Sequence, residues 1–150
     1  MQEPSPQEAL AALDAFVGTW SMTSSFAPDP ADAPLAETTF EWMPGHRFLI
    51  QRWEVGHPAA PDGIAIIGFD ADRATLLQHY FDERGVARVY DITFDCRLWT
   101  LQRIASAPDF SQRFTGTFAD DGDTIVGRWD TSHDSSTWER DFDLTYTRVR

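Results

Sequence analysis

Three side chains of one predicted hairpin, His79, Arg88 and Tyr90, could together bind a charged ligand; they lie in the stretch LLQHYFDERGVARVYDITF at residues 76–94. A guanidinium and a phenol can hold an anion through hydrogen bonds, and an imidazole can add a bond or move a proton. The stretch predicts two strands around a turn at DERG, because β-branched and aromatic residues flank turn-forming ones. These groups line a pocket only if they lie on the buried face of the hairpin.

The buried face follows from the alternation of side chains along the two strands. For a loop of two or four residues, odd positions before the turn share a face with even positions after it. That face holds Leu77, His79, Phe81, Val86, Arg88, Tyr90, Ile92 and Phe94. It is the more apolar face, so His79, Arg88 and Tyr90 are predicted to point inward. A buried arginine needs a partner, which is either an anionic ligand or an internal network of acids and water.

Two further arginines are predicted to join this set. If Phe94 pairs with Trp99 around the turn DCRL, then Tyr90 faces Arg103. In the last strand, alternation places Arg140 on the inner face. The candidate ligand-binding residues are therefore His79, Arg88, Tyr90, Arg103 and Arg140.

Two other hairpins differ in how well their turns define the pairing. Asp121-Gly122 is a strong two-residue turn, which pairs Phe118 with Ile125 and directs Arg113 and Arg128 outward. The turn MPGH is ambiguous, since a change of one residue in its loop exchanges the faces of the hairpin over residues 36–55. Either Arg47 or Arg52 is then predicted to join the interior.

The remaining pattern indicates an all-β fold behind a short helix. Strands are predicted over 18–26, 36–43, 46–55, 63–70, 75–82, 86–95, 97–104, 111–119, 123–130 and 136–148. Most connections are too short for a parallel crossover, so neighbours in sequence pair antiparallel. Closure of about ten such strands removes both exposed edges, which favours an up-and-down barrel over an open sandwich. Such a barrel is wide enough to hold a small ligand.

The helix is predicted over residues 6–16. Ser5 can cap it, Pro6 occupies the first helical position, and Glu8 completes a capping box. The Pro-rich loops 27–35 and 56–62 are predicted to be flaps at the rim of the barrel.

Length and charge limit the classes of function. The 150 residues predict a single domain over 1–150, and the net charge of −12 disfavours nucleic acid and membrane surfaces as partners. The start of the chain has no signal-peptide pattern, so a cytoplasmic protein is expected. The protein is also expected to be a monomer or a homodimer. The single cysteine, Cys96, is predicted to be a bystander in a turn.

The motifs predict no metal site and no cofactor. His46 and His57 lie in predicted turns and are expected at the surface. The stretch DDGD lacks the later glutamate of a calcium loop and is interpreted as a hairpin turn. No catalytic triad, phosphate loop or carboxylate pair is present in the pattern.

The stretch FVGTWSM at residues 16–22 resembles the Gly-x-Trp signature of the calycin barrels, which include lipocalins, fatty-acid-binding proteins and nitrobindin. The whole chain is similar to a bacterial family of lipocalin-like domains, through the phrases FEWMPG, HYFDERGVARVY, SQRFTGTF, GRW and DFDLTYTR. The resemblance implies that Trp20 lies at the closed end of the barrel under an arginine, and the antiparallel closure of the barrel places Arg148 or Tyr146 opposite it. It implies no established activity.

Three functions are compatible with the sequence. The first is a barrel that binds a small apolar or aromatic molecule with an anionic group, as the resemblance to fatty-acid-binding proteins implies. The second is a haem protein like nitrobindin, although the glycine-rich continuation of nitrobindin is absent here and His133 lies in a predicted loop. The third is an enzyme that uses His79 as acid or base, which lacks an evident carboxylate to orient the imidazole.

Overall fold

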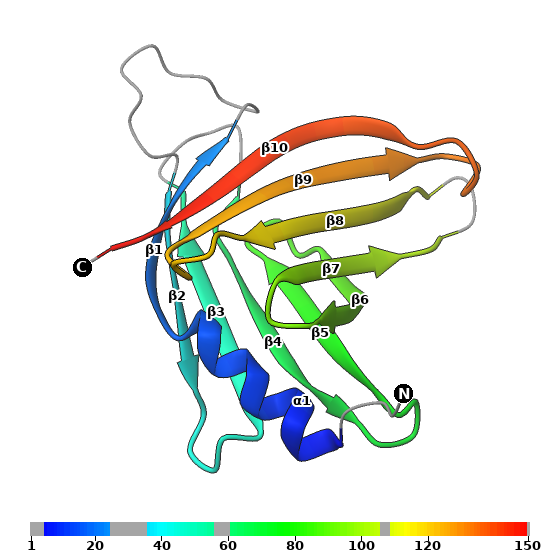
Figure 1. Ribbon diagram of the computed structural model, residues 1–150. Coiled ribbons are helices and arrows are strands. Elements are labelled where there is room, and N and C mark those ends of the chain that lie inside the picture. The colour runs from blue at the N-terminus through cyan, green and yellow to red at the C-terminus, as the bar shows by residue number, and fades with distance from the viewer. Residues whose placement is uncertain (1–4, 25–35, 56–60, 106–108, 150) are drawn as a thin grey trace.

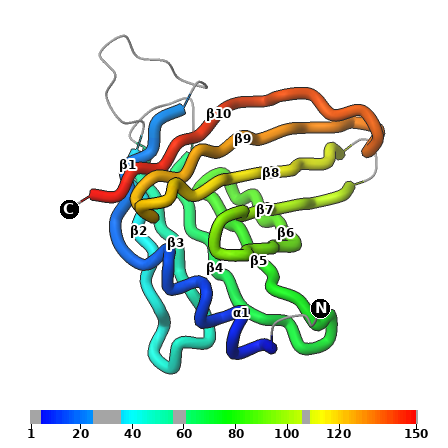
Figure 2. Tube along the Cα trace, viewed as in Figure 1, coloured from blue at the N-terminus to red at the C-terminus, as the bar shows by residue number. Residues whose placement is uncertain are grey.

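The structure is a computed structural model that describes residues 5–24, 36–55, 61–105 and 109–149, and in these residues ten strands form one closed barrel (Figures 1 and 2). Each strand pairs antiparallel with its neighbours in sequence, and β1 closes against β10. The elements are α1 (Pro6–Ala12), the 3-10 turn η1 (Leu13–Phe16), β1 (Gly18–Ser24), β2 (Ala36–Trp42), β3 (Phe48–Glu54), β4 (Gly63–Asp70), β5 (Thr75–Asp82), β6 (Ala87–Phe94), β7 (Leu98–Arg103), β8 (Ser111–Phe118), β9 (Thr124–Ser132) and β10 (Glu139–Arg148). The predicted all-β, up-and-down barrel with a short N-terminal helix is confirmed.

The helix begins as its capping residues predict. The hydroxyl of Ser5 accepts a hydrogen bond of 3.1 Å from the backbone N–H of Glu8, and Pro6 is the first helical residue. The helix continues through η1, which places Leu13 and Phe16 in the core with no exposed surface. In Figure 1, α1 lies across the end of the barrel that carries the β2–β3 and β4–β5 turns.

This closed end holds the densest part of the core. The ring of Phe16 packs against Phe40, Phe94, Trp99 and Phe118, with centroid distances between 4.8 and 5.2 Å. Aromatic rings at such distances attract one another in addition to the area that they bury. The closed end therefore acts as a plug that the helical segment completes.

Trp20 and Arg148 secure the same end, as predicted. Arg148 pairs with Trp20 across β1 and β10, and its guanidinium carbon lies 4.2 Å from the centroid of the indole ring. The guanidinium also donates to the carbonyls of Ala15 and Val17 at 2.9 and 2.8 Å. The indole N–H of Trp20 donates to the carbonyl of Phe16 at 2.9 Å. The cation–π contact and these bonds tie both ends of the chain to the plug.

The loop around Asp121-Gly122 gives the predicted pairing, although it has four residues, 120–123, in place of the predicted two, with the Ala119 N–H bonded to the carbonyl of Thr124. Phe118 pairs with Ile125 and Phe114 with Trp129, so these apolar side chains share the inner face. The predicted pairing of Phe94 with Trp99 around the β6–β7 turn is also confirmed. Loops of two and four residues with the same centre pair the same residues, so the predicted register of the β8–β9 hairpin is kept.

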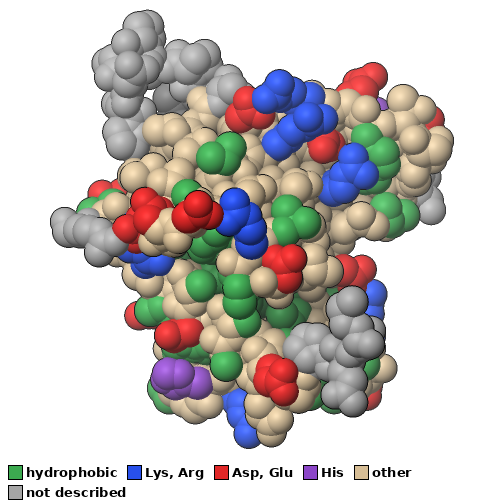
Figure 3. Space-filling view, viewed as in Figure 1, with side chains coloured by type: hydrophobic (Ala, Val, Ile, Leu, Met, Phe, Trp, Pro, Cys, Tyr) green, Lys and Arg blue, Asp and Glu red, His purple; other side chains and the backbone are tan. Residues whose placement is uncertain are grey.

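Figure 3 shows basic side chains gathered over the outer faces of β8–β10. The arginines of this region are Arg113, Arg128 and Arg140, and the chain contains no lysine. Asp130 lies among them and is 2.7 Å from the Nε of Arg128. The predicted outward direction of Arg113 and Arg128 is confirmed. Each is next in sequence to a residue of the inner face, Phe114 or Trp129, so alternation places it on the outer face.

Some predictions fall outside the described residues. These are the flap 27–35, residues 56–60 of the second flap, and His57. No helix in the described part of the chain is long and apolar enough to cross a membrane.

Candidate functional site

The barrel encloses a cavity of about 460 Å³ between the aromatic plug and the end where β5 ends and β6 begins. We call this second end the mouth. Most of the wall is apolar or aromatic, and polar groups are concentrated in a few places, as is usual for small-molecule sites. The residues that line the cavity are Met22, Ser24, Gln51, Trp53, Val55, Pro61, Gln78, Tyr80, Arg84, Arg88, Tyr90, Trp99, Leu101, Phe110, Gln112, Phe114, Trp129, Asp141, Phe142, Leu144 and Tyr146.

Arg88 and Tyr90 line this cavity, as predicted, and meet at Gln112. The amide oxygen of Gln112 accepts a hydrogen bond of 2.7 Å from the phenol of Tyr90 and one of 3.3 Å from Arg88. Burial raises the pKa of Tyr90, while the charge of Arg88 opposes this. The phenol therefore stays neutral at pH 7 and keeps its proton to donate.

Arg103 lies beside this group and is largely internal, with 16% of its side chain exposed. It donates to the carbonyl of Phe110 at 2.8 Å and forms an ion pair with Asp109. Its guanidinium and that of Arg88 lie 5.9 and 5.1 Å from the centroid of the Phe110 ring. The ring of Phe110 thus contacts both cations by cation–π interactions.

The two arginines differ in their partners. Arg103 is neutralised by Asp109, whereas no carboxylate within the described ranges lies within 4.0 Å of the Arg88 nitrogens. The partners of Arg88 are an amide oxygen and a ring face, which are weak acceptors for a full positive charge. Since a guanidinium cannot lose its proton at physiological pH, Arg88 presents an unneutralised charge to the cavity.

A second polar group lies at the β5–β6 hairpin. The side chain of Asp82, which has no exposed surface, accepts hydrogen bonds from Tyr80 at 2.6 Å and from Arg84 at 2.7 Å. The bonds from Arg84 hold the pKa of Asp82 well below its usual range. Burial raises the pKa of Tyr80, and the bond to Asp82 adds to this effect. Arg84 is therefore already paired within the protein.

Replacing Asp82 by asparagine is expected to lower the free energy of unfolding at pH 7 by about 1–3 kcal/mol, because Arg84 loses its ion-pair partner and Tyr80 loses a charged acceptor. The folded pKa of Asp82 is lowered, so its contribution is complete above the unfolded pKa of about 3.9 and is lost as the pH falls toward the folded value. Urea unfolding should therefore separate wild type and variant clearly at pH 7 and less at pH 3. An equal difference at both pH values would contradict this assignment.

The deeper wall contains polar groups with fewer partners. The amide oxygen of Gln78 and the indole N–H of Trp99 are buried and have no hydrogen-bond partner among the described residues. Gln51 donates to the hydroxyl of Thr38 at 3.1 Å. Burial raises the pKa of Tyr146, so its phenol is also neutral at pH 7. The polar groups named here, toward the plug, are uncharged, whereas those at the mouth include charged side chains.

The inward direction predicted for His79 is wrong. β5 pairs with β6 through Gln78 with Tyr90 and Tyr80 with Arg88, so His79 lies on the outer face and is exposed. The hairpin has a three-residue loop, in which Gly85 adopts a φ of +86° and the N–H of Asp82 bonds to the carbonyl of Val86. An odd loop length shifts the pairing by one residue, and the predicted inner face of β5 becomes its outer face.

The inward direction predicted for Arg140 is also wrong. A β-bulge between Arg140 and Phe142 places one extra residue on β10, so Arg140 pairs with Asp130 on the outer face. Arg140 forms an ion pair with Asp143 there. The bulge directs Asp141 to the cavity in its place.

The ambiguous hairpin over 36–55 places neither arginine inside. Trp42 pairs with Leu49, which fits the register that puts Phe40 and Trp42 on one face with Trp53. Arg52 lies on the outer face beside Glu41, and Arg47 lies in the exposed turn before β3. The inner face of this hairpin therefore carries no charged side chain; it is formed by Ala36, Thr38, Phe40, Trp42, Leu49, Gln51 and Trp53.

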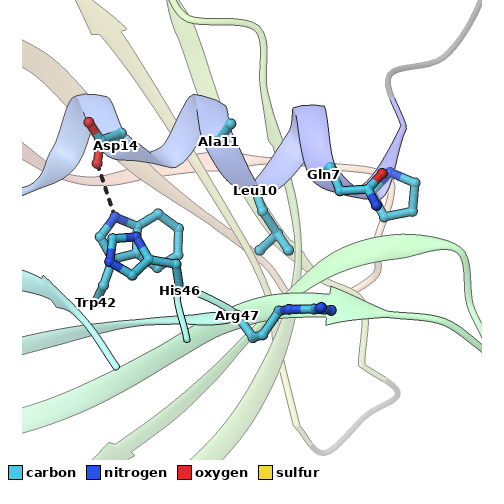
Figure 4. Close-up of a pocket in the computed structure, with 8 residues that line it drawn as sticks. Gln7, Leu10, Ala11, Asp14, Trp42, His46 and Arg47 are labelled. Atoms are coloured by element: carbon cyan, nitrogen blue, oxygen red, sulfur yellow. Dashed lines mark hydrogen bonds between the residues drawn. The ribbon is translucent and has the colours of Figure 1, made fainter. Parts of the chain in front are cut away.

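A second hollow of about 440 Å³ lies outside the barrel, between α1 and the β2–β3 turn (Figure 4). There the His46 ring stacks on Trp42 with a centroid distance of 5.2 Å, and the Trp42 indole donates to Asp14 at 3.0 Å. The predicted surface position of His46 is confirmed. The Trp42–Asp14 bond attaches the helical segment to β2.

None of the described histidines, His46, His79 and His133, lines the barrel cavity. The described residues also contain no group of three or more His, Cys, Asp or Glu side chains that could hold a metal ion. The part of the interior that the structure describes thus offers no imidazole to a haem iron or to acid–base catalysis.

The residues of the mouth that sequence reasoning missed include Phe110, Gln112 and Asp141. Gln112 was detectable, because the Asp121-Gly122 turn places Phe114 inside and alternation then places residue 112 on the same face. Phe110 precedes β8 and Asp141 lies in a bulge, so no periodic pattern indicates either.

These features define a closed antiparallel β-barrel with an internal cavity whose mouth carries arginine. The barrel is similar to the crystal structure of Rv2717c from M. tuberculosis, with a TM-score of 0.56, over 95% of this chain and 98% of that chain. The sequence identity is 15%, so the similarity shows a shared fold. No family model matches the chain, and no curated protein matches it.

Proposed function

We propose that this protein is a calycin-like barrel that binds a small, largely aromatic or apolar molecule through an anionic group on that molecule. The observation that carries the proposal is the charge of Arg88, which lines the cavity without a carboxylate partner in the described part of the chain. The carboxylate, phosphate or sulfonate of a guest would complete this site. Tyr90 and Gln112 would position the guest, and Arg103, which does not line the cavity, would hold Phe110 beside it.

Electrostatics favours an anion over a neutral guest. Removing a charge from water is costly unless a partner replaces the lost solvation, and a guanidinium offers two parallel N–H donors to a carboxylate. Arg84 is already bonded to Asp82, and Arg103 to Asp109. Arg88 is therefore the cation of the mouth that gains most from an added anion.

The walls favour a flat body behind the anionic group. Trp53 stacks on Tyr80 at 5.5 Å, and Tyr90 contacts Trp129 edge-on at 5.8 Å between ring centroids. Such surfaces offer ring faces and edges to an aromatic guest. The polar groups of Gln78 and Gln51 interrupt the wall, so it is less uniform than one built for a hydrocarbon chain.

The calycin assignment rests on the closed end. Gly18 and Trp20 form the Gly-x-Trp pattern at the start of β1, and Arg148 from the last strand covers the indole. This arrangement is the one that the resemblance to lipocalins implies. The likeness to the Rv2717c barrel agrees with it at the level of the fold.

The test compares two probes of the same shape, 1-naphthoate and the neutral 1-naphthamide. Because Trp53, Trp99 and Trp129 line the cavity, binding should change tryptophan fluorescence. We expect 1-naphthoate to bind at least about tenfold more tightly, since only it supplies a charge to Arg88. Native mass spectrometry of the purified protein should in addition reveal a co-purified anionic molecule. Equal affinities for the two probes would contradict an anion site.

A further inference from the structure

The β-bulge in β10 changes which charged side chain reaches the cavity. Arg140 pairs with Asp130 and Phe142 pairs with Trp129. Between these two pairs β10 therefore contains one more residue than β9. Without the bulge, alternation from Phe142 would place Arg140 inside and Asp141 outside. Bulges are often found next to binding sites, where they redirect a side chain. Here the redirected group is a carboxylate.

Asp141 lines the cavity at the mouth, and it is exposed to solvent there. It has no ion pair and no hydrogen bond with any residue of the described ranges. This distinguishes it from Asp82, Asp109 and Asp143, each of which pairs with an arginine. Partial burial raises the pKa of Asp141, and no cation offsets that effect.

The mouth therefore carries two unpaired charges of opposite sign. Arg88 is on β6 and Asp141 is on β10, four places apart around a ring of ten strands. Positions four places apart in such a ring lie on nearly opposite walls. The two groups do not neutralise each other directly, since no ion pair joins them. A guest between them meets a cation on one wall and a carboxylate on the other.

The surroundings of Asp141 suit a cationic group. Trp129 and Phe142 pair next to the bulge and line the cavity on the same wall. Ammonium groups bind well to a carboxylate beside aromatic faces, because the ring faces carry partial negative charge. Arg88 lies on the other wall beside Tyr90 and Gln112, with the donors that suit an anion.

We propose that Asp141 determines specificity for a zwitterionic ligand, an elongated aromatic molecule with an anionic group at one end and an amine at the other. This proposal rests on the function proposed above and names the class of ligand. The carboxylate of Asp141 binds the amine while Arg88 binds the anion. The body of the ligand spans the aromatic cavity between them.

The experiment uses two matched probes, 4′-(aminomethyl)biphenyl-4-carboxylate and 4′-ethylbiphenyl-4-carboxylate. They share an anion and a ring system and differ in an ammonium group against a methyl group. Titration calorimetry at pH 7 should show that wild type prefers the amine by about tenfold or more. Asp141→Asn should remove this preference and leave the affinity for the ethyl probe unchanged or higher. Asp143→Asn, which alters the outer face of the same strand, should keep the preference.

The possible outcomes separate the two proposals. If wild type binds both probes equally and Asp141→Asn changes neither, the amine site is overturned while the anion site stands. If Asp141→Asn and Asp143→Asn reduce the preference equally, the effect is a general one of surface charge, and the assignment to Asp141 fails. If neither probe binds, or Arg88→Met alters the affinity for neither, the proposed anion-binding function itself is overturned.

Discussion

Replacing Phe16 by alanine is expected to lower the free energy of unfolding by about 3–5 kcal/mol, the usual range for removing a buried phenylalanine. Phe16 has no exposed surface, and its ring contacts Phe40, Phe94, Trp99 and Phe118 at once. The loss combines the burial of the ring with the cavity that its removal leaves. Neighbouring rings cannot fill that space, because the closed barrel holds the strands that carry them.

The size of this effect follows from the position of the cavity. Part of the barrel interior is a cavity rather than packed core, so stability depends strongly on the closed end. Phe16 is supplied by the helical segment and not by a strand, which makes the plug sensitive to a single residue. Denaturant unfolding followed by tryptophan fluorescence and by circular dichroism would measure the loss.

The control for Phe16→Ala is Val126→Ala, a truncation on the outer face of β9 where the side chain is 61% exposed. It should cost less than about 1 kcal/mol, since it removes strand propensity and little buried area. If Phe16→Ala cost no more than this control, the helical segment would not be part of the core.

Replacing Arg88 by methionine is expected to weaken the binding of 1-naphthoate by about 2–5 kcal/mol, the range for truncating one partner of a buried charge pair. The same change should hardly affect 1-naphthamide, which has no charge to lose. The fold should remain intact, because methionine fills a similar volume and removes a desolvated charge. The only hydrogen bond that Arg88 makes to Gln112 is long, at 3.3 Å, so its loss is a small cost.

Arg52→Met is the matched control, since Arg52 lies on the outer face of β3 and pairs with Glu41. It removes the same charge from the protein without touching the cavity. Fluorescence titrations should show that this variant binds both probes like wild type. If Arg52→Met weakened 1-naphthoate as much as Arg88→Met, the effect would come from net charge, and the anion site would be disproved.

Several features of the site were predictable because they depend on local chemistry. The inward direction of Arg88 and Tyr90 follows from the apolar face that they share with Ile92, and the structure agrees. The pairing of Phe118 with Ile125 was predicted from a two-residue turn at Asp121-Gly122, and the four-residue loop 120–123 that forms there keeps the same register, because the two loops have the same centre. Ser5 and Pro6 mark the start of the helix for similar reasons.

Other features were not predictable, because they depend on a single residue of offset. The loop before Val86 has three residues, and this alone exchanges Gln78 and His79 between the inner and outer faces of β5. A bulge in β10 similarly exchanges Arg140 and Asp141. Side-chain alternation has a period of two, so any insertion of one residue reverses every direction beyond it.

The sequence by itself therefore determined the number, order and antiparallel pairing of the strands and the capped helix, because these follow from hydrophobic alternation and turn residues along the chain. Tertiary structure alone decided which polar and charged groups line the mouth together. Arg88, Gln112 and Asp141 come from β6, β8 and β10, and their approach depends on barrel closure and on a bulge. Closure brings together residues that are distant in sequence, and no local pattern specifies the contacts between them.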